Sequence, residues 1–285
     1  MPSPQLAPEV TAFYTDVFDE DARLTSSADG RLELLRTQEL LRRFLPEAPA
    51  RVLDVGGGTG VHARWLVADG YEVELVDPVP RHVEQARRVC AASLGDARQL
   101  DAGDEAFDVV TLLGPLYHLP ERDDRLRALR EAARVVRPGG LVAAAGINRY
   151  ASVFEHTALA HLHTPRLRDS IADILATATY DGRRGFTVSY FHRAEELAAE
   201  LRAAGLHDVQ VFGIEGPSWS LLKAVEHATG APPADALVQS ALTAARLAEP
   251  YPELLAASSH LLAVGRAAGR GGHGDAGVTS AGPRP

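Results

Sequence analysis

The sequence predicts an α/β fold in which a mostly parallel, seven-stranded sheet carries helices on both faces. From residue 51 onward, short apolar runs alternate with helical patterns. The first apolar run ends in a glycine-rich turn, and strand-like runs return at residues 208–212 and 260–265 after an interruption. Regular alternation of strands and helices is typical of parallel sheets whose crossover helices cover both faces. A chain of 285 residues is long enough to bury a sizeable core under such layers.

Residues 1–50 precede the alternation and are predicted to form a helical N-terminal lid, in which a helix over 31–45 ends at Pro46 and Pro49. The core is predicted over residues 51–146. Its strands are expected at 52–55, 72–76, around Leu94, 107–113 and 141–146, its helices at 61–68, 81–92 and 122–136, and a turn at 137–140.

The alternation of strands and helices ends after Gly146, and residues 147–190 are predicted to form an inserted helical cap. Residues 191–265 are expected to complete the core. Helices are predicted there at 194–204, 218–228 and 234–248, together with strands at 208–212 and 260–265. Residues 266–285 are rich in Gly, Ala, Arg and Pro without periodicity, so a disordered tail is expected.

Composition argues against a polyanionic partner and favours a small molecule. Acidic residues outnumber basic ones by 38 to 29, and the formal net charge is −9. No apolar stretch has the length of a signal peptide or a membrane span, so we expect a cytoplasmic protein that binds neither nucleic acid nor membrane. The single cysteine, Cys90, excludes an intramolecular disulfide and is expected to be a buried thiol. The oligomeric state is left open.

The segment Arg51–Gly60 ends a strand in the pattern Asp54-x-Gly56-x-Gly58-x-Gly60. Three positions without a side chain let the backbone turn sharply against a ligand. The dinucleotide fingerprint requires a later third glycine, at the position where Val61 stands, and the nucleoside-triphosphate loop is also missing. A nicotinamide-dependent oxidoreductase is therefore disfavoured.

This pattern resembles motif I of the class I S-adenosylmethionine-dependent methyltransferases, which have a Rossmann-like fold. Later strand ends agree in order with that family, through Asp77, Asp96-Ala97, the loop 112–119 and the turn 137–140. The resemblance is strong over 51–146 and extends to the strands near 208 and 260. It is close to a bacterial small-molecule subgroup that carries Gly-Pro-Leu-Tyr-His-Leu at 114–119, Tyr-Phe-His-Arg at 190–193 and Glu-Gly-Pro at 215–217.

The resemblance implies S-adenosylmethionine as the cofactor. Asp77 would hold the ribose, Asp96 and Ala97 would read the adenine, and Leu113 would lie beside the sulfonium. The methionine carboxylate would be bound by Arg36 or by amides of the glycine turn, unless Arg36 is only a solvated charge on its helix. The expected cofactor-binding residues are Asp54, Gly56, Gly58, Gly60, Asp77, Pro78, Asp96, Ala97, Leu113 and Arg36.

Methyl transfer to O, N or activated C of a small molecule is expected, in secondary metabolism, by in-line displacement that needs alignment more than a base. His118 and Tyr14 are the candidate bases, although His118 could instead be structural and Tyr14 could be core. Acceptor-pocket candidates are Tyr117, His156, Tyr190 and Trp219, followed by Tyr180, His192 and Glu215. The alternative function is S-adenosylmethionine binding without methyl transfer, by a non-catalytic partner or a non-methylating enzyme.

No metal is expected. On one helix, His156 and His163 would lie roughly 10 Å apart, which is too far to share an ion. His161 and His163 would point apart on such a helix.

Overall fold

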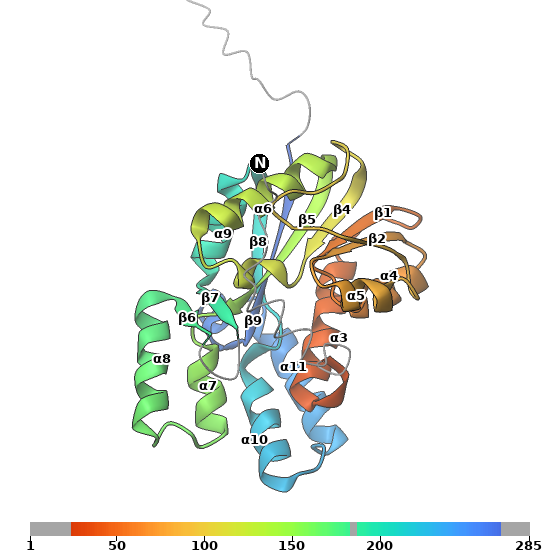
Figure 1. Ribbon diagram of the computed structural model, residues 1–285. Coiled ribbons are helices and arrows are strands. Elements are labelled where there is room, and N and C mark those ends of the chain that lie inside the picture. Colours follow the sequence, from red (N-terminus) through yellow and green to blue (C-terminus); the bar gives the residue numbers. More distant parts are fainter. Residues whose placement is uncertain (1–23, 183–186, 269–285) are drawn as a thin grey trace, which may run out of the picture.

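The computed structural model describes residues 24–182 and 187–268, and a single mixed sheet lies at its centre between helices (Figure 1). The strands in the order β3-β2-β1-β4-β5 are parallel, β9 pairs antiparallel with β5, and β8 pairs antiparallel with β9. Their bounds are β1 Arg51–Val55, β2 Glu72–Asp77, β3 Ala91–Leu94, β4 Phe107–Leu112, β5 Val136–Asn148, β8 Leu206–Gly213 and β9 His260–Ala267. The predicted α/β fold and its seven strands are confirmed, and two further strands bring the sheet to nine.

Two apolar layers cover opposite faces of the sheet, because successive side chains of a strand alternate between its faces. Val52 and Val109 belong to one layer, against α3 (Ala28–Arg42) and α4 (Val61–Ala68). Leu53 and Val110 belong to the other, against α6 (Arg122–Val135) and α9 (Ala194–Ala203). Strands buried on both faces read as continuous apolar runs, which is why the core strands were visible in the sequence.

The remaining helices are α5 (Pro80–Ala86), α10 (Trp219–Thr229) and α11 (Asp235–Ala248), with short 3₁₀ turns η1 (Pro115–His118), η2 (Gly216–Ser218) and η3 (Pro252–Ala257). The helix predicted over 81–92 is shorter than expected, since the chain enters β3 at Ala91. The predicted turn 137–140 lies within β5, where Gly139 takes φ +75° and the register with β4 shifts.

The insertion after the core is only partly helical. It begins with α7 (Ala151–Ala158) and α8 (Pro165–Thr177) but continues into a hairpin of β6 (Thr179–Asp181) and β7 (Val188–His192). The run Val-Ser-Tyr-Phe-His at 188–192 alternates buried and half-buried side chains and is rich in aromatic residues, which favours a strand. The helical expectation was therefore wrong for this part of 147–190.

Three smaller expectations concern the ends of the chain, the cysteine and membrane spans. Strand β9 includes residues 266 and 267, which were expected in the disordered tail. The rest of the expected tail, residues 269–285, and residues 1–23 of the expected lid lie outside the described residues. Cys90 is half-buried against the α3-side layer, and burial raises the pKa of its thiol to about 11. Across residues 24–182 and 187–268, every helix is too short or too polar to cross a bilayer.

Candidate functional site

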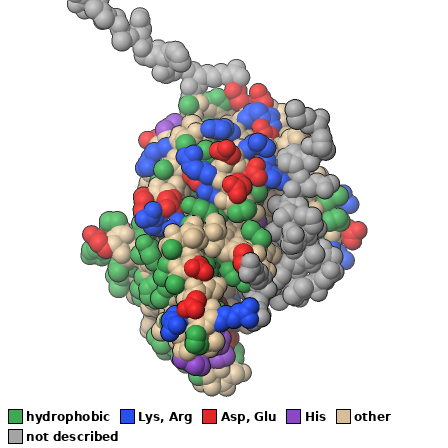
Figure 2. Space-filling model, turned by 60° about the vertical axis from the view of Figure 1, so that its left-hand side comes forward, with side chains coloured by type: hydrophobic (Ala, Val, Ile, Leu, Met, Phe, Trp, Pro, Cys, Tyr) green, Lys and Arg blue, Asp and Glu red, His purple; other side chains and the backbone are tan. Residues whose placement is uncertain are grey.

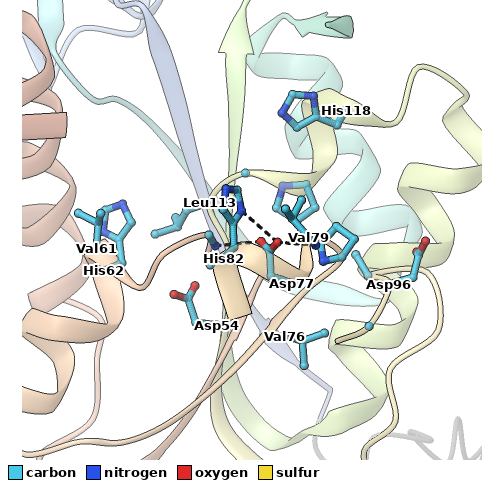
Figure 3. Close-up of a pocket in the computed structure, with 18 of the residues that line it drawn as sticks. Asp54, Val61, His62, Val76, Asp77, Val79, His82, Asp96, Leu113 and His118 are labelled. Atoms are coloured by element: carbon cyan, nitrogen blue, oxygen red, sulfur yellow. Dashed lines mark hydrogen bonds and ion pairs between the residues drawn. The ribbon is translucent and has the colours of Figure 1, made fainter. Parts of the chain in front are cut away.

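A cavity lies outside the carboxyl ends of β1, β2 and β4, the edge where ligands bind in open α/β sheets (Figure 3). The space between its lining residues is about 940 Å³, part of which is open to solvent. The structure brings most of the predicted cofactor residues to its wall: Asp54, Gly56, Gly58, Asp77, Pro78, Asp96, Ala97 and Leu113. Tyr117 and His118 complete the wall from η1.

The glycine turn has the sharp backbone conformation that the sequence predicted. Gly56, Gly58 and Gly60 have φ values of +66°, +58° and +88°, in the left-handed region that favours glycine. Gly57, which sequence reasoning passed over, is the most tightly enclosed: a Cβ atom there would lie 2.4 Å from Asp54 Oδ2. Gly60 is the N-cap of α4, packs against Ala86 and is not part of the cavity wall.

Asp54 is fully buried beneath this turn. Its Oδ1 accepts a hydrogen bond of 2.7 Å from Thr111 Oγ1, while Oδ2 has no hydrogen-bond partner among the described residues. Burial raises the pKa of Asp54 to about 6, with the Thr111 hydroxyl opposing and the Asp77 charge adding to the effect. A buried carboxylate oxygen without a partner fits a cationic ligand group.

Asp77 ends β2 and is buried as well. Its Oδ2 accepts the Gly58 amide at 2.9 Å, and its Oδ1 accepts the Val79 amide at 2.9 Å and lies 3.2 Å from His82 Nδ1. The carboxylate thus closes the glycine turn of β1 onto β2. Each carboxylate oxygen has two acceptor sites, so further hydrogen bonds to a ligand are compatible with these contacts.

Asp96 is held by a neighbour that the sequence analysis did not identify. Arg98 donates to both of its oxygens at 2.7–2.9 Å and reaches Asp124 at 2.8 Å. These pairs fix the Asp96 carboxylate beside Ala97 in the wall.

His118 and Tyr117 lie across from Asp77 on η1, and their rings meet edge to face with centroids 4.6 Å apart. His118 Nδ1 lies 3.0 Å from Thr187 Oγ1, and both residues are buried. One ring nitrogen of His118 therefore joins the cavity loop to the start of β7.

Besides Gly60, four residues of the predicted site lie away from the cavity. Arg36 is buried, contrary to both expectations, and donates to Glu39 at 2.6 Å, Glu249 at 2.8 Å and the Ile214 carbonyl at 3.3 Å. Trp219 is core and donates to the Ala257 carbonyl at 3.0 Å. His156 pairs with His161, Nδ1 to Nδ1, at 3.3 Å.

The fourth, Tyr190, stacks under Arg125, whose guanidinium carbon is 3.5 Å from the ring centroid. The other acceptor candidates, Tyr180, His192 and Glu215, are also absent from the wall of this cavity, and Tyr14 lies outside the described residues.

The cavity also contains residues that sequence reasoning missed, namely Leu24, Gly57, Val79 and His82. Only Gly57 had a local signal, as part of the glycine run. His82 faces Asp77 from the first turn of α5, a contact that depends on how α5 packs against the sheet (Figure 3).

Outside the cavity, and within the part of the chain that the structure describes, Glu33, Glu215 and His260 offer ligand atoms within 4.8 Å of one another. They are the described residues that could hold a metal ion, although no metal was expected. Each comes from a different element, so their sequence positions gave no motif.

A family model described as a methyltransferase domain matches residues 29–211, more than half of the chain. An uncharacterised methyltransferase of Mycobacterium tuberculosis is 39% identical over 105 residues, or 36% of this chain and 42% of the relative. The chain thus spans less than half the length of that relative. A ubiquinone biosynthesis O-methyltransferase of Xanthomonas axonopodis is 31% identical over 227 residues, which covers 73% of this chain and 87% of the relative.

Solved structures agree on the fold. A S-adenosylmethionine-dependent methyltransferase of Thermotoga maritima, described as a possible histamine N-methyltransferase, has a TM-score of 0.57 at 22% identity over 90% of this chain and 99% of its own. The [4+2]-cyclase SpnF has a TM-score of 0.51 at 22% identity, over 89% of this chain and 85% of its own. The chain belongs to the methyltransferase-domain family, and its fold is that of class I S-adenosylmethionine-dependent methyltransferases.

Proposed function

We propose that this protein transfers the methyl group of S-adenosylmethionine to a small-molecule acceptor. The observation that carries the proposal is the charge of the cavity: Asp54, Asp77 and Asp96 line it, and its described wall contains no lysine or arginine. Such a wall suits a cofactor that has no phosphate and carries positive charge, and it does not suit a dinucleotide.

The residues present fit this cofactor. The unpartnered Oδ2 of Asp54 would accept from the cationic methionine end, Asp77 would accept from the ribose hydroxyls, and Asp96 with Ala97 would meet the adenine. When bound, the cofactor supplies an activated methyl group on a positively charged sulfur. The protein aligns the acceptor and excludes water, which are the main requirements of in-line displacement.

The acceptor is proposed to be an oxygen, nitrogen or activated carbon nucleophile. The O-methyltransferase name of the relative that covers 73% of this chain supports oxygen first. Membership of the small-molecule subgroup and a role in secondary metabolism are also proposals, which rest on the motifs at 114–119, 190–193 and 215–217.

For His118 we propose a structural role. Its contact with Thr187 and its ring contact with Tyr117 fix the loop that forms one wall of the cavity. Replacement by Ala should weaken cofactor binding through loosening of this loop, while the rate of methyl transfer at saturating cofactor stays close to that of the unaltered protein. A large loss of that rate with intact binding would make His118 a catalytic residue.

Calorimetry with S-adenosylmethionine, S-adenosylhomocysteine and NAD tests the cofactor, and tighter binding of NAD would contradict the proposal. Asp77→Ala should weaken S-adenosylmethionine binding by about 1–3 kcal/mol through the loss of hydrogen bonds to a charged group. Asp77→Asn keeps one acceptor oxygen but removes the charge, so weaker binding in this variant is not explained by an unfolded glycine turn. Asp173→Ala, an exposed aspartate on α8, is the control and should bind normally.

Methyl transfer itself is tested with S-adenosylmethionine labelled in the methyl group and a panel of phenols, amines, indoles and carboxylates. Label in at least one acceptor supports the proposal. Tight cofactor binding without label in any acceptor would favour the alternative, a protein that binds S-adenosylmethionine without transferring its methyl group.

A further inference from the structure

We propose that Arg98 determines which base the cofactor site accepts, by fixing the Asp96 carboxylate as the acceptor for the exocyclic amine of adenine. Arg98 acts through Asp96 and is therefore a positioning residue. The inference rests on the proposed function. It adds the residue that gives the site its preference for adenine over a base with a carbonyl oxygen at the same position.

The three carboxylates of the cavity are spread across it. Figure 3 shows Asp54 and Asp96 on opposite sides of the view, with Asp77 between them. Because we assign Asp54 to the cationic end of the cofactor and Asp77 to the ribose, the base comes to lie at Asp96. The Gly95 amide donates to the Asp77 carbonyl at 3.2 Å, which ties the loop that carries Asp96 to the end of β2.

Arg98 holds the Asp96 carboxylate with two parallel hydrogen bonds. Its Nε donates to Oδ1 at 2.9 Å, and its Nη2 donates to Oδ2 at 2.7 Å. The Arg98 amide also donates to Oδ1, at 2.8 Å. Paired hydrogen bonds of this kind fix the plane of a carboxylate as well as its position. The side chains of Arg98 and Asp96 are only 8% and 13% exposed, so water competes little for the pair.

The acceptor sites of Asp96 are almost used up by these contacts. A carboxylate oxygen can accept two hydrogen bonds. Oδ1 already accepts two, from the amide and the Nε of Arg98, whereas Oδ2 accepts one among the described residues. The second position on Oδ2 would accept from the amine of adenine. An ionised carboxylate cannot donate, so a carbonyl oxygen in place of the amine would face another acceptor with no proton between them.

Arg98 is itself anchored to a helix. Its Nη1 donates to Asp124 Oδ2 at 2.8 Å, and Asp124 lies in the first turn of α6. The guanidinium is thus held between two carboxylates, from the Asp96 loop and from α6. Its position depends on the fold and not on a ligand, so the Asp96 carboxylate is oriented before the cofactor binds. Such preorganisation lowers the cost of binding.

Calorimetry with S-adenosylhomocysteine and S-inosylhomocysteine tests the proposal, because the second compound carries a carbonyl oxygen in place of the amine. The unaltered protein should bind the adenosyl compound about 100-fold more tightly or better, since a site built to accept a hydrogen bond rejects a ligand without the donor. In Arg98→Leu, affinity for the adenosyl compound should fall by about 10-fold to 100-fold, as expected for one hydrogen bond to a charged group. Affinity for the inosyl compound should change little, because that compound makes no hydrogen bond to Asp96. The ratio of the two affinities therefore narrows.

Two further variants keep the test informative if Arg98→Leu folds poorly. Arg98→Lys keeps the positive charge but cannot make the two parallel hydrogen bonds, so the ratio should narrow here as well. Asp96→Asn presents an amide that can donate, so affinity for the inosyl compound should rise while affinity for the adenosyl compound falls.

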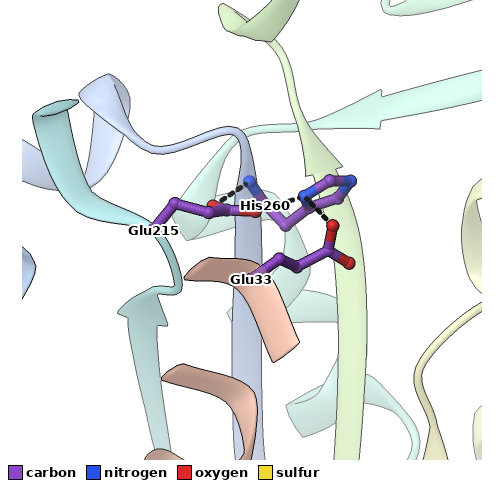
Figure 4. Close-up of side chains that lie close together, drawn as sticks. All are labelled: Glu33, Glu215 and His260. Atoms are coloured by element: carbon purple, nitrogen blue, oxygen red, sulfur yellow. Dashed lines mark hydrogen bonds and ion pairs between the residues drawn. The ribbon is translucent and has the colours of Figure 1, made fainter. Parts of the chain in front are cut away.

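Two control variants separate this role from a general loosening of the fold. Arg127→Leu removes an exposed arginine that lies 3.7 Å from the same Asp124, and both affinities should stay unchanged. His260→Gln removes a partner of Glu215, a buried carboxylate outside the cavity wall, whose Oε1 lies 2.5 Å from His260 Nδ1 (Figure 4). The ratio of the two affinities should stay the same in this variant too.

The ratio of affinities in the Arg98 variants decides the proposal. A ratio that stays unchanged in both variants, whether or not the affinities fall, would overturn it and leave Arg98 a structural role. Equal affinities of the unaltered protein for the two compounds would also overturn it. Failure of the unaltered protein to bind either compound would instead refute the proposed function.

Discussion

Asp54 and Asp77 end neighbouring strands at one cavity, but their carboxylates have opposite surroundings. Asp77 accepts two backbone amides, whereas Asp54 keeps one buried oxygen without a partner in the described structure. The charge of Asp77 also opposes ionisation of Asp54. The Asp77 carboxylate therefore holds the turn, whereas the Asp54 carboxylate has a buried oxygen to which we assigned, as a proposal, the cationic end of the cofactor.

This difference predicts a pH dependence of cofactor binding. Because the pKa of Asp54 is raised to about 6, the free protein carries a proton there in acid, while a cationic ligand requires the ionised form. Affinity for S-adenosylmethionine should fall as the pH drops below about 6, by at most about tenfold per pH unit. Calorimetry across this range should show the slope in the unaltered protein and its loss in Asp54→Asn, and an unchanged slope would contradict the role given to Asp54.

Gly57 gives a steric prediction. A Cβ atom there would lie 2.4 Å from Asp54 Oδ2 and 2.6 Å from Leu75 Cδ1, so Gly57→Ala should lower the free energy of unfolding by about 1–3 kcal/mol and weaken cofactor binding. Gly103→Ala is the matched control, since a Cβ atom there would meet nothing within 4 Å. Urea denaturation of both variants checks this, and equal stabilities would contradict it.

Residues whose roles depend on the strand and its turn could be predicted from the sequence, and residues whose roles depend on distant partners could not. Asp54 and Asp77 lie at the ends of β1 and β2 and Asp96 follows β3, so the strand pattern predicted their common edge, while the role given to each came from the family resemblance. Arg36 was misplaced because its partners are Ile214 and Glu249, far along the chain.

Among the elements, α6, α9 and β7 are joined by a buried polar network behind the cavity loop. Arg125 of α6 pairs with Glu200 of α9 at 2.8 Å and donates to the carbonyls of Leu119 and Pro120 at 2.7–2.8 Å. Burial alone would raise the pKa of Glu200, but hydrogen bonds from His192 and Arg125 keep it below its usual value. Tyr190 and His192 of the Tyr-Phe-His-Arg motif join this network, through Arg125 and Glu200 respectively.

Breaking this pair on one side should be costly. Arg125→Leu leaves the Glu200 carboxylate buried without its main partner and should reduce the free energy of unfolding by about 3–5 kcal/mol. The double variant Arg125→Leu, Glu200→Leu removes both charges and should recover part of this loss. Chemical denaturation of both variants checks it, and a double variant no more stable than Arg125→Leu alone would contradict it.

Helices and strands with a clear pattern of apolar residues were predicted well. The helix α4 and the strands β1 and β2 agree closely with expectation, because Gly56 follows β1, Gly60 precedes α4 and Pro78 follows β2. The hairpin of β6 and β7 was missed, since its strands are short and β7 gains its second neighbour only at the extended end of β5.

At the scale of the whole molecule, α3 connects the N-terminal part of the described chain to its C-terminal helices (Figure 1). Arg36 of α3 and Arg43, the residue after α3, both pair with Glu249, just after α11, at 2.8 Å and 2.5 Å. Lys223 of α10 pairs with Asp29 of α3 at 3.2 Å and with Glu155 of α7 at 2.7 Å. Figure 2 shows a group of histidine side chains at the lower end of the molecule, beside acidic and basic side chains, and more histidine surface near the upper end of this face.

The buried position of Arg36 predicts a stability effect without a cofactor effect. Arg36→Met should lower the free energy of unfolding by about 1.5–3 kcal/mol, through loss of its hydrogen bonds to charged partners, and leave the dissociation constant of S-adenosylmethionine unchanged. Thermal unfolding and calorimetry on the same sample check both parts. Weaker cofactor binding at unchanged stability would contradict this and would support the earlier prediction that Arg36 binds the methionine carboxylate of the cofactor.

The long strand β5 has a consequence for how such enzymes can diverge. Its last residues, Ile147 and Asn148, pair with Phe191 and His192, and the Arg149 amide donates to the His192 carbonyl at 2.8 Å. The two ends of the insertion therefore lie side by side, and the cost of closing a loop grows slowly with its length. Segments of other sizes can therefore join these two points while the strands that carry the cavity keep their pairing, so the insertion can change in length without change in the cavity wall.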